Sequence, residues 1–391
     1  MKFLDIEEQK LRQEKLQQFI RQQGLDGLLV SSNANLYYVS GAVYAGYAYL
    51  PAEGNMLYLV RRPVGIEHPQ VVYIRKPEQI LDVLESVGIA KPARLALELD
   101  RLPYNMAKRL QAAFNVDDIF NGSPILSQSR SVKTPFEIEL IRQSGIRHSN
   151  SYQRIDSVFE VGMTDVEFQI EMERVLRCDG CLGIFRISGE TMELFMGNVL
   201  GGENADTPTP YDFAMGGEGL DQSLPIGCNG TVLRRGNTLM VDMNGNFTGY
   251  MTDMTRSFRV GDVPQLAIDA HRLSIDIHNR LREAIRPGFA AAEAYNLAVA
   301  MVADAGLDDY FMGHRQKAGF IGHGVGIEVN ELPVLAPRSR DVFSAGNVIA
   351  IEPKFVIPGV GAVGVENTYL VTDNGLECLT NFPEELADLC Q

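Results

Sequence analysis

Apolar positions along the first third of the chain switch between the spacing of helices and the spacing of strands. The segment from about Asp5 to Gln23 has the pattern of an amphipathic helix, which ends at Gly24. Short apolar runs and longer amphipathic segments follow: strands are predicted at 27–32, 56–60, 71–74 and 95–99, and helices at 78–87 and 104–114. Because the two kinds of element alternate, we expect a small α/β domain with a mixed or parallel sheet. It has no nucleotide-binding fingerprint, so we expect a scaffold.

A polar, turn-rich segment at 121–133 (NGSPILSQSRSVK) is the predicted domain boundary. We therefore expect an N-terminal domain at 1–125 and a C-terminal domain at 133–391. Thr134 followed by a proline is typical of the first turn of a helix. Thr164, with Glu167 three residues later, predicts a second helix that begins with a capping box.

The C-terminal part contains a faint internal repeat. Residues 161–180 align without gaps against residues 287–306, at an offset of 126, and each copy follows another long helical segment. The identical pairs are Gly162 and Gly288, Glu167 and Glu293, and Gly180 and Gly306. The repeat predicts two similar α+β halves with a cleft between them.

Composition narrows the class of protein. A chain of 391 residues with 45% apolar and 22% charged residues is typical of a soluble globular protein with two domains. Its net charge of −15 argues against nucleic acid or an anionic membrane as a partner. No apolar run is long enough for a bilayer, and the start of the chain has the pattern of a charged helix rather than a signal peptide. The five scattered cysteines form no disulfide pattern, so we expect a cytoplasmic protein.

Candidate chemistry lies in two predicted hairpins. Asp242 and Asp253 occupy strand-like runs on either side of a glycine- and asparagine-rich turn. Glu352 and Glu366 lie at equal distances from Gly359, which stands in a second turn, so a regular hairpin would place them face to face. All four carboxylates have apolar neighbours, and a buried carboxylate is costly unless a cation or donor pairs with it.

His323 adds an imidazole from the glycine-rich turn GHGVG. Four clustered carboxylates need about four positive charges, and two divalent ions, roughly 3.5–4 Å apart, would supply them. Oxygen-rich ligation with one imidazole favours Mn²⁺, Co²⁺, Fe²⁺ or Zn²⁺. The sequence thus predicts two divalent ions bound by five residues, the ligand cage: Asp242, Asp253, His323, Glu352 and Glu366.

The order and spacing of these motifs resemble the pita-bread metallopeptidase family, which includes methionine aminopeptidase, prolidase, aminopeptidase P and creatinase. The motifs are VDMNGNFTGYMTDMTRSF, GHGVG, IEP and VEN, together with SNANLYYVSG at 32–41. The resemblance implies an α+β protein whose C-terminal pita-bread (creatinase/aminopeptidase) fold follows a smaller α/β domain of the creatinase type. It also implies a homodimer.

The resemblance further implies roles within the site. Asp253 and Glu366 would bridge the two ions, Asp242 would complete one ion's ligands, and His323 and Glu352 would complete the other's. A hydroxide between the metals would attack the carbonyl carbon of a short peptide, often one with proline after the scissile bond. Glu352 and His323 would be the catalytic residues, with Glu352 carrying the proton. The predicted enzyme is therefore a metal-dependent hydrolase similar to Xaa-Pro aminopeptidases and dipeptidases.

Three positions depart from the family pattern. Asn330, Pro225 and Gly364 stand where the peptidases carry histidine, histidine and arginine. The segment at 186–222 is long and glycine-rich for the family and would form a different lip on the cleft. A metallohydrolase of another small amide or C–N substrate and a non-catalytic family member therefore remain alternatives. Asn330 and His314 are candidates for binding substrate.

Overall fold

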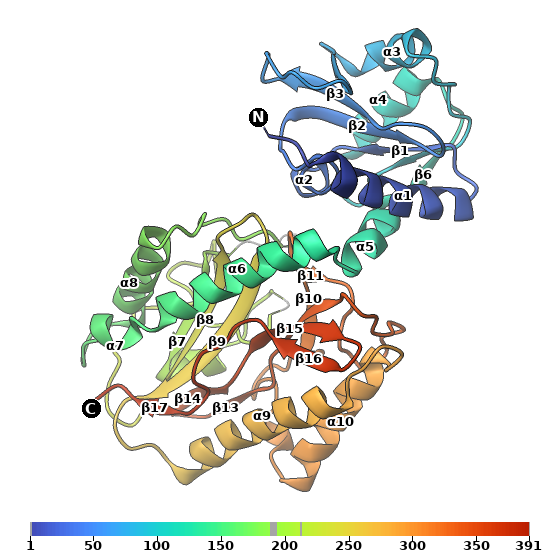
Figure 1. The fold of residues 1–391 in the computed structure, drawn as a ribbon. Coiled ribbons are helices and arrows are strands. Elements are labelled where there is room, and N and C mark those ends of the chain that lie inside the picture. Colours follow the sequence, from blue (N-terminus) through green and yellow to red (C-terminus); the bar gives the residue numbers. More distant parts are fainter. Residues whose placement is uncertain (1, 188–193, 212, 391) are drawn as a thin grey trace. The chain divides into compact units, whose positions relative to one another are not determined.

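The computed structural model describes residues 2–187, 194–211 and 213–390. The chain divides into two units, Met1–Arg130 and Ser131–Gln391. Figure 1 shows the elements of both. Among the described residues, no helix combines the length and the apolar character that crossing a membrane requires.

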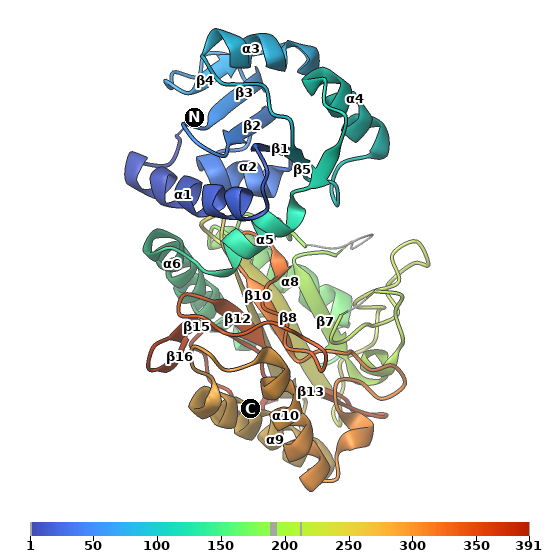
Figure 2. The same cartoon turned by 90° about the vertical axis from the view of Figure 1, so that its right-hand side faces the viewer.

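A six-stranded mixed sheet forms the centre of the N-terminal unit, in the order β4-β3-β2-β1-β5-β6. Its elements are α1 Ile6–Gln22, β1 Gly27–Val30, α2 Asn33–Ser40, β2 Ala45–Pro51, β3 Leu57–Arg62, β4 Val71–Tyr73, η1 Pro77–Gln79, α3 Ile80–Ser86, β5 Leu95–Leu97, α4 Tyr104–Phe114, β6 Ile119–Asn121 and α5 Ser123–Ser131. Helices α1 and α2 cover one face of the sheet and α3 and α4 cover the other (Figure 2). Every helix and strand predicted for this region is present.

The segment at 121–133 differs from its prediction. Most of it forms the helix α5 rather than a turn-rich linker. Ile125 and Leu126 are buried there, so tertiary packing of this apolar pair outweighs the low helix propensity of the surrounding serines.

Three sheets build the C-terminal unit: β17-β9-β8-β7, β11-β10-β12-β15-β16, and the pair β13-β14. Its elements are α6 Pro135–Tyr152, α7 Ile155–Val158, α8 Asp165–Cys178, β7 Gly197–Gly201, η2 Gly202–Asp206, β8 Thr238–Asn246, β9 Met251–Arg259, α9 Gln265–Ala284, α10 Ala291–Asp304, η3 Asp308–Tyr310, β10 Gly322–Val325, β11 Val329–Glu331, β12 Val348–Ile351, β13 Lys354–Ile357, β14 Gly361–Gly364, β15 Asn367–Thr372, β16 Gly375–Cys378 and β17 Ala387–Asp388. Both predicted hairpins are present, as β8–β9 and β13–β14.

The internal repeat corresponds to a structural repeat. Helices α8 and α10 begin and end 126 residues apart, which is the offset of the sequence alignment. Each follows a longer helix, α6 or α9, and each pair of helices has a separate apolar core, the first against β7–β9 and the second against β12–β15. The predicted plan of two α+β halves is therefore correct (Figure 1).

The predicted lip at 186–222 is only partly a surface loop. Its residues 197–201 form β7, which pairs with β8 along its whole length and is buried. Asn198, Val199 and Leu200 thus belong to the sheet. The prediction missed this strand because glycines stand at both of its ends and are uncommon in strands. Residues 188–193 and 212 of the segment lie outside the described residues.

Candidate metal centre

Hairpin β8–β9 brings two of the predicted ligands onto neighbouring strands. Asp242 lies opposite Thr255, and Asp253 lies opposite Asn244. Asp253 is buried and Asp242 half-buried. The turn at 247–250, with Gly249 at φ +89°, lets the two strands pair over nine residues each.

Glu352 and Glu366 face each other as the turn position predicted. Ile351 pairs with Asn367 on one side of them, and Lys354 pairs with Gly364 on the other. This register leaves Glu352 opposite Glu366. Both glutamates are buried.

Hydrogen bonds join β9 to the residues around the start of β15 at the acids themselves. The Asp253 backbone N–H donates to Thr368 Oγ1 at 2.8 Å, and that hydroxyl donates back to the Asp253 carbonyl at 2.8 Å. Glu366 is held likewise, since its backbone N–H donates to the Thr255 carbonyl at 3.1 Å and its carboxylate accepts from the Thr255 hydroxyl at 2.7 Å. Residues more than 110 positions apart are thereby fixed side by side.

His323 reaches the same place from β10, where it pairs with Ala350 of β12. Its Nδ1 lies 3.1 Å from the Gly324 carbonyl oxygen, and because a carbonyl only accepts, Nδ1 carries the proton. Its Nε2 lies 3.5 Å from Glu352 Oε1. An imidazole held in this way by a backbone carbonyl is typical of a metal ligand.

All five predicted ligands therefore lie together. Two groups have ligand atoms within 4.8 Å of one another: the histidine triad, Asp253, His323 and Glu366, and the lysine triad, Asp242, Glu352 and Glu366. The lysine triad is named for Lys354, which was not among the predicted site residues.

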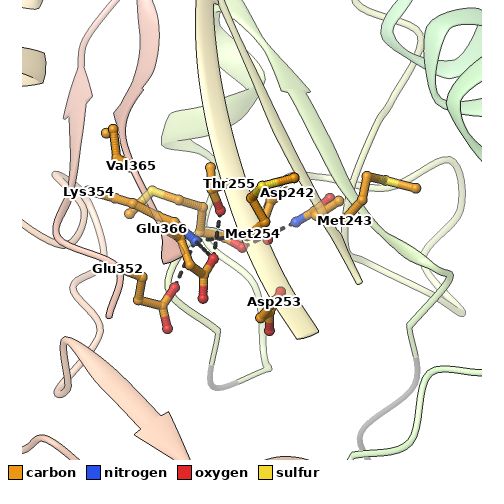
Figure 3. A network of polar contacts seen from close by, with 12 residues as sticks. Asp242, Met243, Asp253, Met254, Thr255, Glu352, Lys354, Val365 and Glu366 are labelled. Atoms are coloured by element: carbon orange, nitrogen blue, oxygen red, sulfur yellow. Dashed lines mark hydrogen bonds and ion pairs between the residues drawn. The ribbon is translucent and has the colours of Figure 1, made fainter. Parts of the chain in front are cut away.

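Lys354 is a cation inside the ligand cage. Its fully buried ammonium group donates to Glu352 Oε2 at 2.7 Å, Asp242 Oδ2 at 2.8 Å and Glu366 Oε2 at 3.1 Å (Figure 3). These are the three residues of the lysine triad. A sequence signal for it existed, because Lys354 follows Glu352 by two positions in IEPKF and extended residues at i and i+2 share a face. Its partner Asp242, on another hairpin, was not predictable.

The pKa values show where positive charge is sufficient and where it is lacking. Burial alone would raise the pKa of Glu352, but the charge of Lys354 and the contact with His323 outweigh it and lower the pKa to about 2. Burial and the charge of Glu352 raise the pKa of Glu366 to about 8. Burial and the charge of Glu366 raise the pKa of Asp253 well above its usual value. Positive charge is therefore lacking at the histidine triad.

The two triads differ in which of their carboxylate oxygens already have a partner. Glu366 Oε1 is buried and has no hydrogen-bond partner among the described residues, although a buried carboxylate oxygen normally has one. An ion bound by Asp253 and His323 would satisfy it. The lysine triad already has an ammonium group within hydrogen-bonding distance of all three carboxylates.

The acids line a cavity whose other wall is mostly aromatic and apolar. Its further lining includes Phe185, Phe213, Phe320 and Val329. Asn330 also lines it and is half-buried, with a φ of +63° that asparagine tolerates better than most residues. The predicted substrate-binding position of Asn330 is thus beside the acids.

Of the other predicted positions, His314 and Pro225 are not among the residues that line this cavity, whereas Gly364 lies beside Lys354. His314 is exposed, with Nδ1 2.9 Å from Asp206 Oδ2, and lines a neighbouring hollow. Pro225 offers its carbonyl to the Thr209 hydroxyl at 2.7 Å. Gly364 lies opposite Lys354 in the β13–β14 pair.

Comparison with family models agrees with this geometry. Residues 139–373 match the model of metallopeptidase family M24. The chain belongs to metallopeptidase family M24. Residues 12–132 of this M24 protein match the creatinase/prolidase N-terminal domain. Membership confirms the predicted pita-bread family, the two-domain α+β plan and an enzyme of the metal-dependent peptidase class.

Relatives of this M24 protein match it over nearly its full length. It is 26% identical over 385 residues to an Xaa-Pro dipeptidase of Pyrococcus furiosus, covering 96% of this chain and 99% of the relative. It is 26% identical over 392 residues to the uncharacterized peptidase YqhT of Bacillus subtilis, with coverage of 96% and 99%. A crystal structure of the prolidase from Pyrococcus horikoshii OT3 superimposes with a TM-score of 0.77 at 23% identity, covering 96% and 99% of the two chains.

Proposed function

We propose that this M24 protein hydrolyses short peptides, with Xaa-Pro dipeptides as the first substrates to test. The convergence of Asp253, His323 and Glu366 at one buried point, beside an apolar cavity, supports the proposal. The Xaa-Pro dipeptidase of Pyrococcus furiosus, similar over 96% of this chain, indicates the substrate class.

The chain's own residues would hold and orient the reactants. His323 Nε2, Asp253 and the free Oε1 of Glu366 would hold a divalent ion, which supplies polarisation of the scissile carbonyl and a water of lowered pKa when bound. Burial raises the pKa of Glu352, but the charge of Lys354 is the main effect that lowers it to about 2. Glu352 is therefore ionised near neutral pH. Its Oε1 faces His323 and is not the oxygen that Lys354 contacts, so it would be the oxygen that carries the proton during hydrolysis.

The number and identity of the ions are finer proposals. Two ions, of Mn²⁺, Co²⁺, Fe²⁺ or Zn²⁺, are predicted from four carboxylates that need about four positive charges. That estimate counted no cation from the protein. Because Lys354 supplies one positive charge, the four carboxylates need less positive charge from bound metal ions.

Hydrolysis assays with the metal-loaded protein test the proposal. A panel of Xaa-Pro dipeptides, dipeptides without proline and longer peptides would be assayed with each candidate metal. We expect cleavage of dipeptides and its loss, by at least about 100-fold, in Asp253→Asn, because that change removes one charge from the histidine triad. A folded wild-type protein that binds metal and cleaves none of these peptides would contradict peptide hydrolysis.

A second candidate function is hydrolysis of another small amide or C–N substrate. Asn330 favours it, because an amide beside the acids can donate and accept hydrogen bonds but cannot transfer a proton near neutral pH. Gly364, in place of the family arginine, leaves no cationic side chain at that position. Activity on small amides without activity on peptides would select this alternative, and activity on neither would select a non-catalytic role.

Assembly and location are separate proposals. The family resemblance predicts a homodimer, and light scattering with the metal-loaded protein would measure its mass. Scattered cysteines without a disulfide pattern support a cytoplasmic protein. Cell fractionation would test that location.

A further inference from the structure

We propose that the ammonium group of Lys354 takes the place of a second metal ion, so that this centre binds one divalent ion at the histidine triad. The inference deepens the proposed function, because it specifies the centre through which that hydrolase would act. It concerns metal stoichiometry, which is measured independently of hydrolysis.

The three contacts of Lys354 carry the proposal. The ammonium group donates a hydrogen bond to one carboxylate from each of three segments: β8, the residues directly after β12, and the segment between β14 and β15. Three N–H groups matched to three acceptors leave none of its hydrogens unused. A divalent ion held by the same three carboxylates would compete for the same oxygens and would be repelled by the ammonium charge.

Glu366 distinguishes the two cation positions. Its Oε2 accepts from Lys354 at 3.1 Å and from the Thr255 hydroxyl at 2.7 Å, whereas Oε1 has no partner among the described residues. A carboxylate that bridges two metal ions needs one oxygen for each. Here Oε2 is already hydrogen-bonded within the protein, and Oε1 remains for an ion beside Asp253 and His323.

Gly364, which stands in place of the family arginine, lies beside Lys354. The two residues are paired across β13 and β14. A Cβ atom on Gly364 would lie 3.2 Å from Lys354 Cγ and 2.9 Å from its Cα, and the residue has a φ of +145°. The Pro353 carbonyl oxygen lies 2.7 Å from the same Cβ position, so backbone atoms and the lysine stem together occupy the space that a side chain at 364 would need.

Metal stoichiometry tests the proposal. Purified protein would be stripped with chelator, reloaded with Mn²⁺ and analysed by elemental mass spectrometry and electron paramagnetic resonance. We expect one ion per chain and the spectrum of an isolated Mn²⁺. In Lys354→Met, which keeps most of the side-chain volume and removes the charge, we expect two ions and the spectrum of a coupled pair.

Lys133→Met is the matched control. Lys133 is also a buried lysine, but it pairs with Glu331 at 3.0 Å, outside the ligand cage. We expect this variant to bind one ion, as the wild type does. A second ion in Lys133→Met would show that loss of any buried lysine raises metal binding, and would overturn the role of Lys354.

Other outcomes also decide the matter. Two ions, or none, in the wild type would overturn the proposal, and so would a folded Lys354→Met protein that binds a single ion. If that variant does not fold, anomalous diffraction from wild-type crystals soaked in Mn²⁺ gives the answer. A peak at the histidine triad alone supports the proposal, and a peak between Asp242 and Glu352 overturns it. One bound ion without hydrolysis would contradict the proposed function but not this inference.

Discussion

The two carboxylate oxygens of Glu366 have different surroundings, and this difference separates the two cation positions of the centre. Oε2 is held by the Thr255 hydroxyl and Lys354, and Oε1 is buried without a hydrogen-bond partner among the described residues. Thr255 therefore fixes the orientation in which Glu366 presents its free oxygen. It would position the ligand without itself binding an ion.

Thr255→Val is expected to weaken metal affinity about 10- to 100-fold, because groups that orient a metal ligand contribute on this scale. Calorimetric titration with Mn²⁺ would measure it. Thr252→Val is the control, since Thr252 lies buried on the same strand and its hydroxyl contacts His148 Nδ1 at 3.1 Å instead. We expect the control to keep wild-type metal affinity, and equal losses in both variants would refute the positioning role.

Asn330→His is expected to raise hydrolysis of Xaa-Pro dipeptides if substrate handling is what separates this chain from the peptidases. Histidine tolerates the φ of +63° at this position, so the backbone should not change. The kcat/KM for Xaa-Pro and for proline-free dipeptides would be compared. An unchanged ratio, in a variant of wild-type stability, would count against this role of position 330.

Among the elements, one buried arginine helps to align β9 with the segments that follow β14 and β16. Arg256 of β9 donates from Nη1 to the carbonyl oxygens of Thr255 and Glu366, both at 2.8 Å. Its remaining nitrogens donate to Asn367 Oδ1 and to the carbonyls of Phe382 and Pro383, each at 2.8 Å. The guanidinium therefore ties the segment that carries Glu366, and the C-terminal segment, to β9.

Arg256→Lys is expected to lower the free energy of unfolding by about 3 kcal/mol, because a lysine keeps the charge but cannot span five acceptors. Urea unfolding would measure the loss, and metal titration would show weaker binding through the displaced Glu366. Arg259→Lys, a partly exposed position on the same strand, is the control. Its cost should stay within about 0.5 kcal/mol.

The start of α8 offers a test of the capping box that the sequence predicted. The Thr164 hydroxyl accepts from the Glu167 backbone N–H at 3.2 Å, and the Glu167 carboxylate accepts from the Thr164 backbone N–H at 2.7 Å. Thr164→Ala should therefore lower the free energy of unfolding by about 1 kcal/mol. Ser157→Ala removes an exposed hydroxyl that donates to the Arg154 carbonyl at 2.6 Å, and it should change the free energy of unfolding by less than about 0.5 kcal/mol. Equal effects in urea unfolding would argue against the cap.

At the scale of the whole molecule, an ion would add stability to the C-terminal unit, which contains all five predicted ligands. Mn²⁺ at about 100 times its dissociation constant should stabilise that unit by about 2.7 kcal/mol and raise its melting temperature by several degrees. Calorimetric scans with Mn²⁺ and with chelator would measure the shift. Asp253→Asn should abolish it, and a shift of equal size in that variant would place the stabilising ion elsewhere.

Local chemistry made much of this molecule predictable. Helix caps at Thr134 and Thr164, the hairpin turns and the register that sets Glu352 opposite Glu366 depend on neighbours in sequence, so the residues themselves indicated them. The repeat gave the bounds of α8 and α10 relative to each other. Helix α5 and strand β7 were misjudged, because burial in the tertiary structure outweighed polar and glycine-rich composition there.

The sequence by itself determined which acids would be buried and that they would need cations. Only the tertiary structure decided which cation each acid meets. Lys354 stands two residues from Glu352, but its contact with Asp242 joins positions 112 residues apart. Such a contact depends on how two hairpins pack, and no periodicity or turn signal carries that information. The ammonium group among three carboxylates became visible only when the folded chain brought them to one point.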